Sequence, residues 1–363
     1  MGFDLQPTEE QAALKETLAD FAANVLRPAA RDAEAAKSTP ETIARQLHAI
    51  GIAAPVAEEF GGGGAVDPVT YCLAAEELAW GDPGIAWQVL GSGIAAIVVG
   101  EAGTDDQKRR YLGHFTEAST PKAFVALGEK LAAGDLETLE TTVDDAKVTG
   151  DKYGVLNASD AAVGVVVGRT PDGLGAVVLD EPSSWEVVKP EDKLGLEAAP
   201  TSVVRFDAAG DALPVGPRLD NAILWAKLMV GAVAVGCARA SLEYASQYAT
   251  EREAFGKPIG AFQAISFKIA EMAIEVDAAR LEVWRAAWKI ANQEATPADV
   301  AEANGQALAT AVRCGDDGVQ ILGGHGYIRD HPVEKWFRDA VTLSVFDAPD
   351  LMGDMVVARS VGA

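Results

Sequence analysis

The chain has 363 residues, of which 49% are hydrophobic and 23% charged, and its net charge at pH 7 is -24. These proportions are ordinary for a folded globular protein and exclude wholesale disorder. The strong negative charge argues against nucleic acid and anionic membranes as partners, because like charges repel.

The chain carries three cysteines, Cys72, Cys237 and Cys314, which are odd in number and far apart. They fit neither a disulfide framework nor a metal cluster, and no histidine pair has ligand spacing, so we expect no metal site. The first residues, MGFDLQPTEEQ, are acidic and polar, unlike a signal peptide. The longest apolar run, 228–238, is too short to span a bilayer. We therefore expect a cytoplasmic protein without a membrane partner.

The first part of the chain, up to about residue 118, is rich in alanine, leucine and glutamate at helical spacing. A helix is predicted within 7–30, with Thr8 as its N-cap and a proline, Pro28, towards its far end. Further helices are expected over 71–80 and 104–112, and a glycine-rich loop at 60–67.

The middle of the chain changes pattern. Short runs of β-branched residues alternate with Gly, Pro and Asp, which is typical of an antiparallel sheet or a small barrel. No stretch of helical length interrupts these runs, so a dinucleotide-binding βαβ unit is not expected here. The runs lie at 164–170, 175–180, 185–190 and 202–207.

The last part is predicted to be a helix bundle. Proline is absent from Arg218 to Lys257, which favours one long helix, and a second helix follows the turn GKPIG at 256–260. This second helix has an apolar seam that needs helical partners. The seam residues are Ile265, Ile269, Met272, Val276, Ala279 and Val283. A third helix is expected over 298–322, and a fourth begins near 332.

Two motifs in the bundle invite a functional reading. The residues 251–263 include Arg252, whose guanidinium can grip a phosphate, within a glycine- and proline-rich turn. The residues 320–339 place the pair Gly323 and Gly324 at a helix end, where another backbone or a ligand can approach closely. Taken alone, the pattern of the first motif favours a plain turn with an exposed arginine, and the second motif can be a helix C-cap. Neither matches a dinucleotide or P-loop fingerprint.

Taken together, the segments resemble the acyl-CoA dehydrogenase family. Residues 248–290 and 319–340 are similar to that family's two C-terminal signatures, and 76–87 with 102–115 to its N-terminal domain. The resemblance covers nearly the whole chain. It implies an all-α N-terminal domain over 1–118, a middle antiparallel β-barrel over 119–216 and a C-terminal four-helix bundle over 217–363, assembled as a tetramer.

The resemblance also implies a chemistry. FAD binds between barrel and bundle, a carboxylate removes a proton from the α-carbon of an acyl-CoA, and a hydride passes from the β-carbon to the flavin. An electron-transfer flavoprotein is the expected acceptor. By similarity, six residues contact the adenine and pyrophosphate half of an FAD held mainly by a neighbouring subunit: Arg252, Phe255, Gln263, Gln320, Gly323 and Gly324.

The ring half of the flavin site departs from the family pattern. Gly128, Glu129 and Lys130 stand where the family has a Thr-Glu-Pro motif, and Gly134 replaces a serine. The Trp-Ile-Thr or Trp-Ile-Ser segment that packs on the flavin ring is missing, because the chain runs directly from Asn157 into the next strand. The ring side of the site is therefore expected to be damaged.

The position of the catalytic base departs too. Where the family has an aromatic residue, Glu, Gly and Thr, this chain has Phe346, Asp347, Ala348 and Pro349. Aspartate is one methylene shorter than glutamate, and proline offers neither an N–H nor a hydroxyl to a flavin. Some relatives carry the base on the long helix instead, but the matching residue here is Ala226.

Three hypotheses follow. The first is a non-catalytic subunit that donates half of the FAD site to a second acyl-CoA dehydrogenase subunit in an α2β2 assembly. The second is a homotetrameric dehydrogenase with Asp347 as its base. The third is a CoA-binding scaffold without redox activity, which the intact adenine-side residues disfavour.

Overall fold

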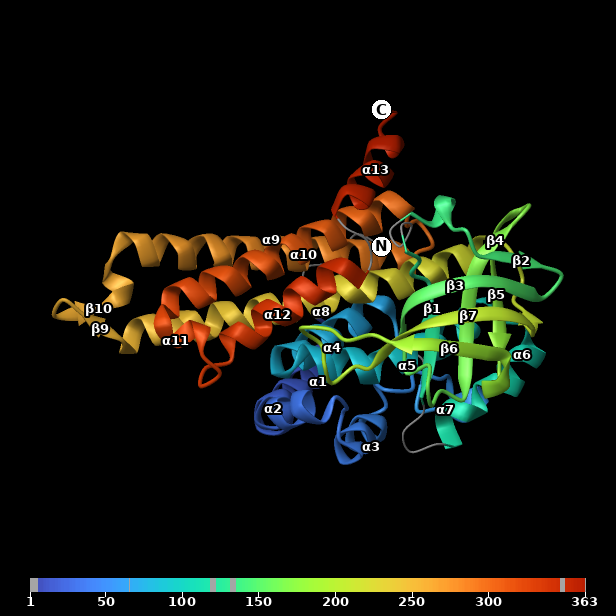
Figure 1. Ribbon diagram of the computed structural model, residues 1–363, viewed down its shortest axis with the longest axis horizontal. Coiled ribbons are helices and arrows are strands. Elements are labelled where there is room, and N and C mark those ends of the chain that lie inside the picture. The colour runs from blue at the N-terminus through green and yellow to red at the C-terminus, as the bar shows by residue number, and fades with distance from the viewer. Residues whose placement is uncertain (1–5, 65, 118–121, 131–134, 347–349, 363) are drawn as a thin grey trace.

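The computed structural model describes residues 6–64, 66–117, 122–130, 135–346 and 350–362 (Figure 1). Helices come first, strands follow and helices end the chain, which confirms the order predicted from the sequence. The domain boundaries at 118/119 and 216/217 remain a prediction.

The first helix begins where the sequence predicted. The Thr8 hydroxyl accepts a hydrogen bond from the Gln11 backbone N–H, and the Gln11 side chain accepts one from the Thr8 N–H, so α1 (Glu9–Phe21) starts with a capping box. The helical path does not stop at Pro28, however. A π-helical segment (Ala22–Leu26) leads into α2 (Arg27–Ala36), and Pro28 sits in its first turn, where a missing N–H is tolerated.

Two of the remaining N-terminal helices are apolar, α4 (Pro68–Gly81) and α5 (Pro83–Ala102). The others are α3 (Glu41–Ile50), α6 (Asp105–Tyr111) and α7 (Gly113–Glu117). Asp82 caps α5 by accepting a hydrogen bond from the Ile85 N–H.

The strands form a mixed, open sheet rather than a closed antiparallel barrel. Among the described residues the order is β6-β7-β3-β2-β4-β5-β8, with β1 beside β4, and this path does not close on itself. The pairings β1–β4 and β2–β4 are parallel, which corrects the expected antiparallel pattern. The strands are β1 (Ala123–Ala126), β2 (Thr142–Asp144), β3 (Lys147–Leu156), β4 (Val163–Thr170), β5 (Gly173–Leu179), β6 (Trp185–Pro190), β7 (Thr201–Ala209) and β8 (Asp211–Ala212).

The C-terminal helices form the predicted bundle. The seam residues Met272, Val276, Ala279 and Val283 are buried, as predicted for a helix with partners on one side. The long helix ends at Glu251, before the expected Lys257, because Arg252 turns to an extended conformation. The elements are α8 (Pro217–Glu251), β9 (Glu253–Ala254), β10 (Lys257–Pro258), α9 (Gln263–Ala291), α10 (Pro297–Leu322), α11 (Gly324–Tyr327), α12 (Val333–Phe346) and α13 (Asp350–Ser360).

Two helices, α5 and α8, are long and apolar enough to cross a membrane by length and composition alone. Their most apolar windows are 83% and 94% buried within the fold, so here these residues serve as core.

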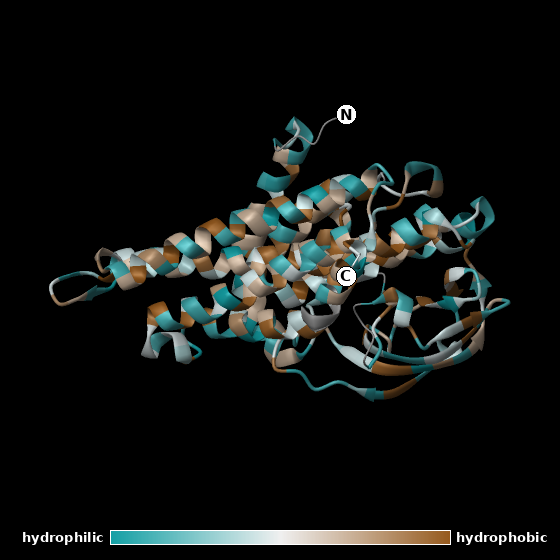
Figure 2. Cartoon of the chain, turned by 90° about the horizontal axis from the view of Figure 1, so that it is seen from above, coloured by the Kyte–Doolittle hydropathy of each residue, from teal (hydrophilic) through white to brown (hydrophobic). Residues whose placement is uncertain are grey.

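The long helix α8 connects the two ends of the molecule. Its first half packs beside α4, α5 and the sheet, whereas its last turns reach the free end of the bundle. That free end carries β9, β10 and α11 and lies opposite the sheet (Figures 1 and 2).

Candidate active site

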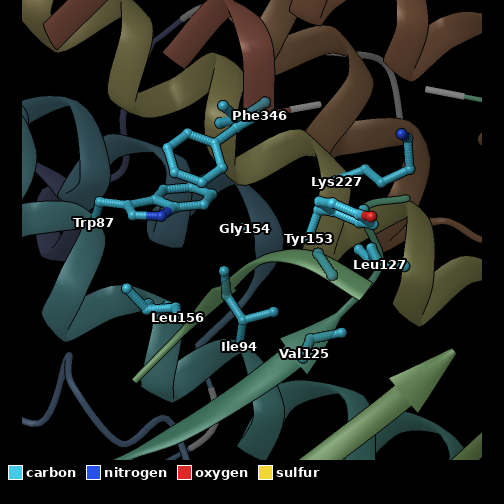
Figure 3. Close-up of a pocket in the computed structure, with 13 residues that line it drawn as sticks. Trp87, Ile94, Val125, Leu127, Tyr153, Gly154, Leu156, Lys227 and Phe346 are labelled. Carbon is cyan, nitrogen blue, oxygen red and sulfur yellow. The ribbon is translucent and has the colours of Figure 1, made fainter. Parts of the chain in front are cut away.

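A small cavity, here called the inner chamber, lies between α5, strands β1 and β3, α8 and the last residue of α12 (Figure 3). Its volume is about 80 Å³. The walls are largely apolar, and Lys227 is their one charged side chain among the described residues. The lining residues are Trp87, Gly91, Ile94, Val125, Leu127, Gly128, Tyr153, Gly154, Leu156, Ala226, Lys227, Val230 and Phe346.

The phenyl ring of Phe346 lies against Gly154 (Figure 3). A Cβ on Gly154 would come within 2.9 Å of a Phe346 ring carbon, so only glycine fits under this ring. Gly154 also has φ +66, where glycine has no steric penalty, and it lies at an irregularity in the β3–β7 register between Lys152 and Val155. The indole of Trp87 lies beside the phenyl ring, with ring centroids 5.9 Å apart.

The strand that forms one wall of the chamber is continuous. We expected the wall to be missing after Asn157, but β3 passes the chamber before that residue, through Tyr153, Gly154 and Leu156. A turn that starts at Asn157 then leads into β4. The wall is thus present, and its difference from the expected tryptophan segment lies in its side chains.

The loop beside the chamber is anchored by a buried ion pair between Glu129 and Lys152. Their atoms approach to 2.8 Å, and their side chains are 5% and 0% exposed. Burial lowers the pKa of Lys152 to about 8 although Glu129 opposes this. Burial also opposes ionisation of Glu129, yet hydrogen bonds from Lys152, Thr141 and Glu140 lower its pKa below the usual value. Glu129 is therefore a structural anion.

The predicted base, Asp347, lies outside the described residues, as do Ala348, Pro349 and Gly134. Its neighbour Phe346 ends α12 and lines the inner chamber. On the facing helix α8, Ala226 and Lys227 line the same chamber. Ala226 carries no ionisable group, so this position offers no carboxylate.

A larger cavity, here called the outer cleft, has a volume of about 620 Å³. Both cavities have lining residues on α8, with Leu224 in the outer cleft and Ala226 in the inner chamber. Its described charged residues are Glu137, Asp220 and Arg169, and burial raises the pKa of Asp220. The lining also includes Leu136, Thr170, Pro171, Gly173, Leu174, Pro217, Asn221, Gln293, Ala295, Thr296 and Pro297.

The six residues expected at the adenine half of FAD lie together at the free end of the bundle. A hydrogen bond of 2.8 Å between the Tyr248 hydroxyl and His325 Nδ1 joins their two segments. Phe255, at the tip of the hairpin, is 96% exposed, and a Cβ at Gly323 or Gly324 would meet nothing within 4 Å. Arg252, Gln263 and Gln320 are exposed too. This end thus presents a cation, an aromatic ring and accessible backbone, which fits a nucleotide.

The inner chamber and the free end are too far apart to hold one dinucleotide within a single chain. From Ala226 to Glu251, α8 rises roughly 38 Å at about 1.5 Å per residue. The inner chamber also does not fit a flavin ring, because 80 Å³ is less than a cavity for one benzene molecule, about 150 Å³. The chemistry of the free end suits the adenine and pyrophosphate half of FAD, whereas the chamber of this chain has no room for the flavin ring.

Sequence reasoning did not single out Trp87, Gly154 or Leu156. Trp87 lies within the segment 76–87 that carries the family resemblance, and it is the bulkiest residue of an otherwise small-residue stretch of α5. Its contact with Phe346 joins residues more than 250 positions apart, which no local pattern predicts.

Comparison with known proteins agrees with this architecture. Residues 8–119 match the family described as acyl-CoA dehydrogenase, N-terminal domain, and residues 218–361 match acyl-CoA dehydrogenase, C-terminal domain. The chain is 31% identical to the probable acyl-CoA dehydrogenase YngJ of Bacillus subtilis (strain 168), over 99% of each chain.

Two solved structures share the fold. Butyryl-CoA dehydrogenase from Megasphaera elsdenii has a TM-score of 0.87 at 28% identity, covering 99% of this chain and 100% of that one. A chain in a structure of the electron transferring flavoprotein of Acidaminococcus fermentans has a TM-score of 0.88 at 28% identity, with the same coverage. The chain therefore belongs to the acyl-CoA dehydrogenase family, whose cofactor is FAD.

Proposed function

We propose that this chain is the non-catalytic subunit of an α2β2 acyl-CoA dehydrogenase that oxidises the α,β-bond of an acyl-CoA. In this role it donates the adenine half of the FAD site to a catalytic partner subunit. One observation carries the proposal. The residues suited to an adenine and pyrophosphate are exposed at the free end, whereas the chain's own inner chamber has no room for a flavin ring.

The charges of the outer cleft support the same role. The phosphate groups of a CoA need cations, but the described lining supplies one cation, Arg169, against the carboxyl groups of Glu137 and Asp220. A cleft of this kind favours acyl-CoA binding on the partner subunit instead.

The oxidation of an acyl-CoA follows from the family. We propose a substrate of the fatty acyl-CoA class, a cytoplasmic location and a place in lipid oxidation. The resemblance to a chain in an electron transferring flavoprotein structure supports such a protein as the electron acceptor.

The second candidate is a homotetrameric dehydrogenase with Asp347 as base. The observation in its favour is that Phe346, the residue before Asp347 in the sequence, lines the inner chamber. A homotetramer would need the chamber to open enough to hold a flavin ring.

The experiment compares the chain purified alone with the chain co-expressed with a second acyl-CoA dehydrogenase-like subunit. Flavin is read from the absorbance at about 450 nm. We expect a colourless chain alone and a yellow, active complex. A yellow and active homo-oligomer would instead establish the second candidate, and no flavin in either sample would favour a scaffold.

A substitution tests whether this chain contacts the bound FAD. Arg252→Ala in the complex should lower the bound flavin at least tenfold, because the phosphate loses a charged, forked donor. Arg109→Ala, an exposed arginine on α6, is the matched control and should retain flavin. Equal flavin content in the two complexes would contradict the proposed role.

A further inference from the structure

We propose that Trp87 and Phe346 form an aromatic plug that fills, in this chain, the space an acyl chain would need, and that Gly154 permits it. The inference rests on the proposed function and names the residues that close this chain's own site. It concerns binding alone and involves no covalent step.

The plug is built from two distant elements. Trp87 comes from α5 and Phe346 from the last turn of α12, and their rings meet at 5.9 Å with an angle of 38° between their planes. Both residues line the inner chamber, and their rings lie next to each other on one side of it (Figure 3).

Gly154 sets the depth to which the plug reaches. Phe346 ring carbons lie 2.9 and 3.0 Å from the place of a Cβ at this position. Any side chain there would push the ring outwards, since such contacts are shorter than van der Waals separation. The phenyl ring therefore occupies space that the side chain of a larger residue at position 154 would fill.

The other walls show that the space suits an apolar chain. Gly91, Ile94, Leu156 and Val230 line the same chamber and offer no side-chain hydrogen bond, and Lys227 and Tyr153 are the polar residues among the other described walls. The two rings take up this volume and leave about 80 Å³.

The indole N–H of Trp87 allows an experiment to distinguish a ring that fills space from a ring that binds a ligand. Within the described part of the chain, its buried indole N–H has no acceptor. If the ring acts by volume, Trp87→Phe keeps the chamber closed. If the N–H serves a bound ligand, the same substitution removes that ligand's binding.

The test is calorimetric titration of the full chain with butyl- and octyl-pantetheine thioethers. These neutral probes lack the CoA phosphates, so the charges of the outer cleft do not decide the result. The variants are Phe346→Leu, Trp87→Phe and the double variant Trp87→Ala/Phe346→Ala. Val345→Ala, an exposed neighbour outside the chamber, is the control. Circular dichroism melting establishes that each variant is folded.

We expect no binding that depends on alkyl length in the wild type, Val345→Ala or Trp87→Phe. The double variant should bind the octyl probe at least tenfold more tightly than the wild type, with up to about fourfold per added methylene. If the double variant fails to fold, Phe346→Leu carries the test and should show a smaller gain in the same direction.

Binding by the wild type that depends on alkyl length would overturn the plug. A folded double variant that binds the octyl probe no more tightly than the wild type would overturn it too. If the double variant does not fold, the same result for a folded Phe346→Leu would overturn it. Binding that Trp87→Phe abolishes would overturn it in favour of a ligand contact. These outcomes differ from a failure of the proposed function, which is a wild-type chain that is yellow and active alone.

Discussion

Glu129, which stands where the family has its Thr-Glu-Pro motif, stabilises the fold through a buried ion pair. Its carboxylate holds Lys152 and accepts hydrogen bonds from the backbone N–H groups of Glu140 and Thr141 at 2.6 and 2.9 Å. The loop that borders the inner chamber is thereby tied to β3. Replacing one partner of such a pair leaves the other charge buried without compensation.

Glu129→Gln should lower the free energy of unfolding by about 3 kcal/mol near neutral pH. The folded pKa of Glu129 lies below its unfolded value of about 4.3, so its stabilisation is present above that pH and is lost as the pH falls through the folded pKa. The difference from the wild type should therefore shrink in acid. Urea unfolding at several pH values measures it, and Glu140→Gln is the exposed control from the same loop.

Gly154 is the second residue whose role depends on a distant contact. Gly154→Ala should destabilise the chain by about 2 kcal/mol, because a Cβ adds a clash with Phe346 to an unfavourable φ. Gly51→Ala shares the positive φ but has nothing within 4 Å, so it isolates the backbone strain. Thermal melting compares the two. Equal losses would mean that the phenyl ring moves aside freely.

Among the elements, α12 matters most for the site because it carries Phe346. Its position depends on Lys335, which donates hydrogen bonds to Asp82 at 2.6 Å and to Asp339 at 2.8 Å. Asp82 caps α5, and Asp339 accepts a hydrogen bond from the Leu196 N–H. One buried cation thus joins α12, α5 and the loop after β6.

Lys335→Met should lower the free energy of unfolding by about 3–5 kcal/mol, since it leaves two carboxylates buried without their cation. Lys189→Met, on the exposed end of β6, should change it by less than about 0.5 kcal/mol. Denaturant titration measures both. A small effect of Lys335→Met would show that the two carboxyl groups share a proton instead of needing the lysine.

For the whole molecule, the separation of the free end from the inner chamber predicts how FAD acts on stability. Ligand binding stabilises a folded state to the extent that the ligand concentration exceeds the dissociation constant, and half of a site binds FAD too weakly to reach that range. We expect added FAD to leave the unfolding temperature of the isolated chain unchanged and to raise that of the complex with its partner subunit. Circular dichroism melting with and without FAD tests this, and a rise in the isolated chain would indicate a flavin site within one chain.

Much of the fold was predictable because it depends on near neighbours in the sequence. The Thr8 cap, the buried seam from Met272 to Val283 and the order of helices and strands all follow from spacing within a few turns. Local patterns were less reliable at Pro28, where a preceding π-helical turn lets the helix continue.

The sequence by itself determined the helical and β segments, the family and the six adenine-side candidates, since all of these are local patterns or motif matches. Only the tertiary structure decided that the sheet stays open, that Phe346 rests on Gly154 beside Trp87, and that the six candidates lie at the far end of α8. The reason is physical. Such contacts join segments that lie far apart in the sequence, from 40 residues for Ala123 and Val163 to more than 250 for Trp87 and Phe346, and they depend on how helices and strands pack rather than on any periodicity within them.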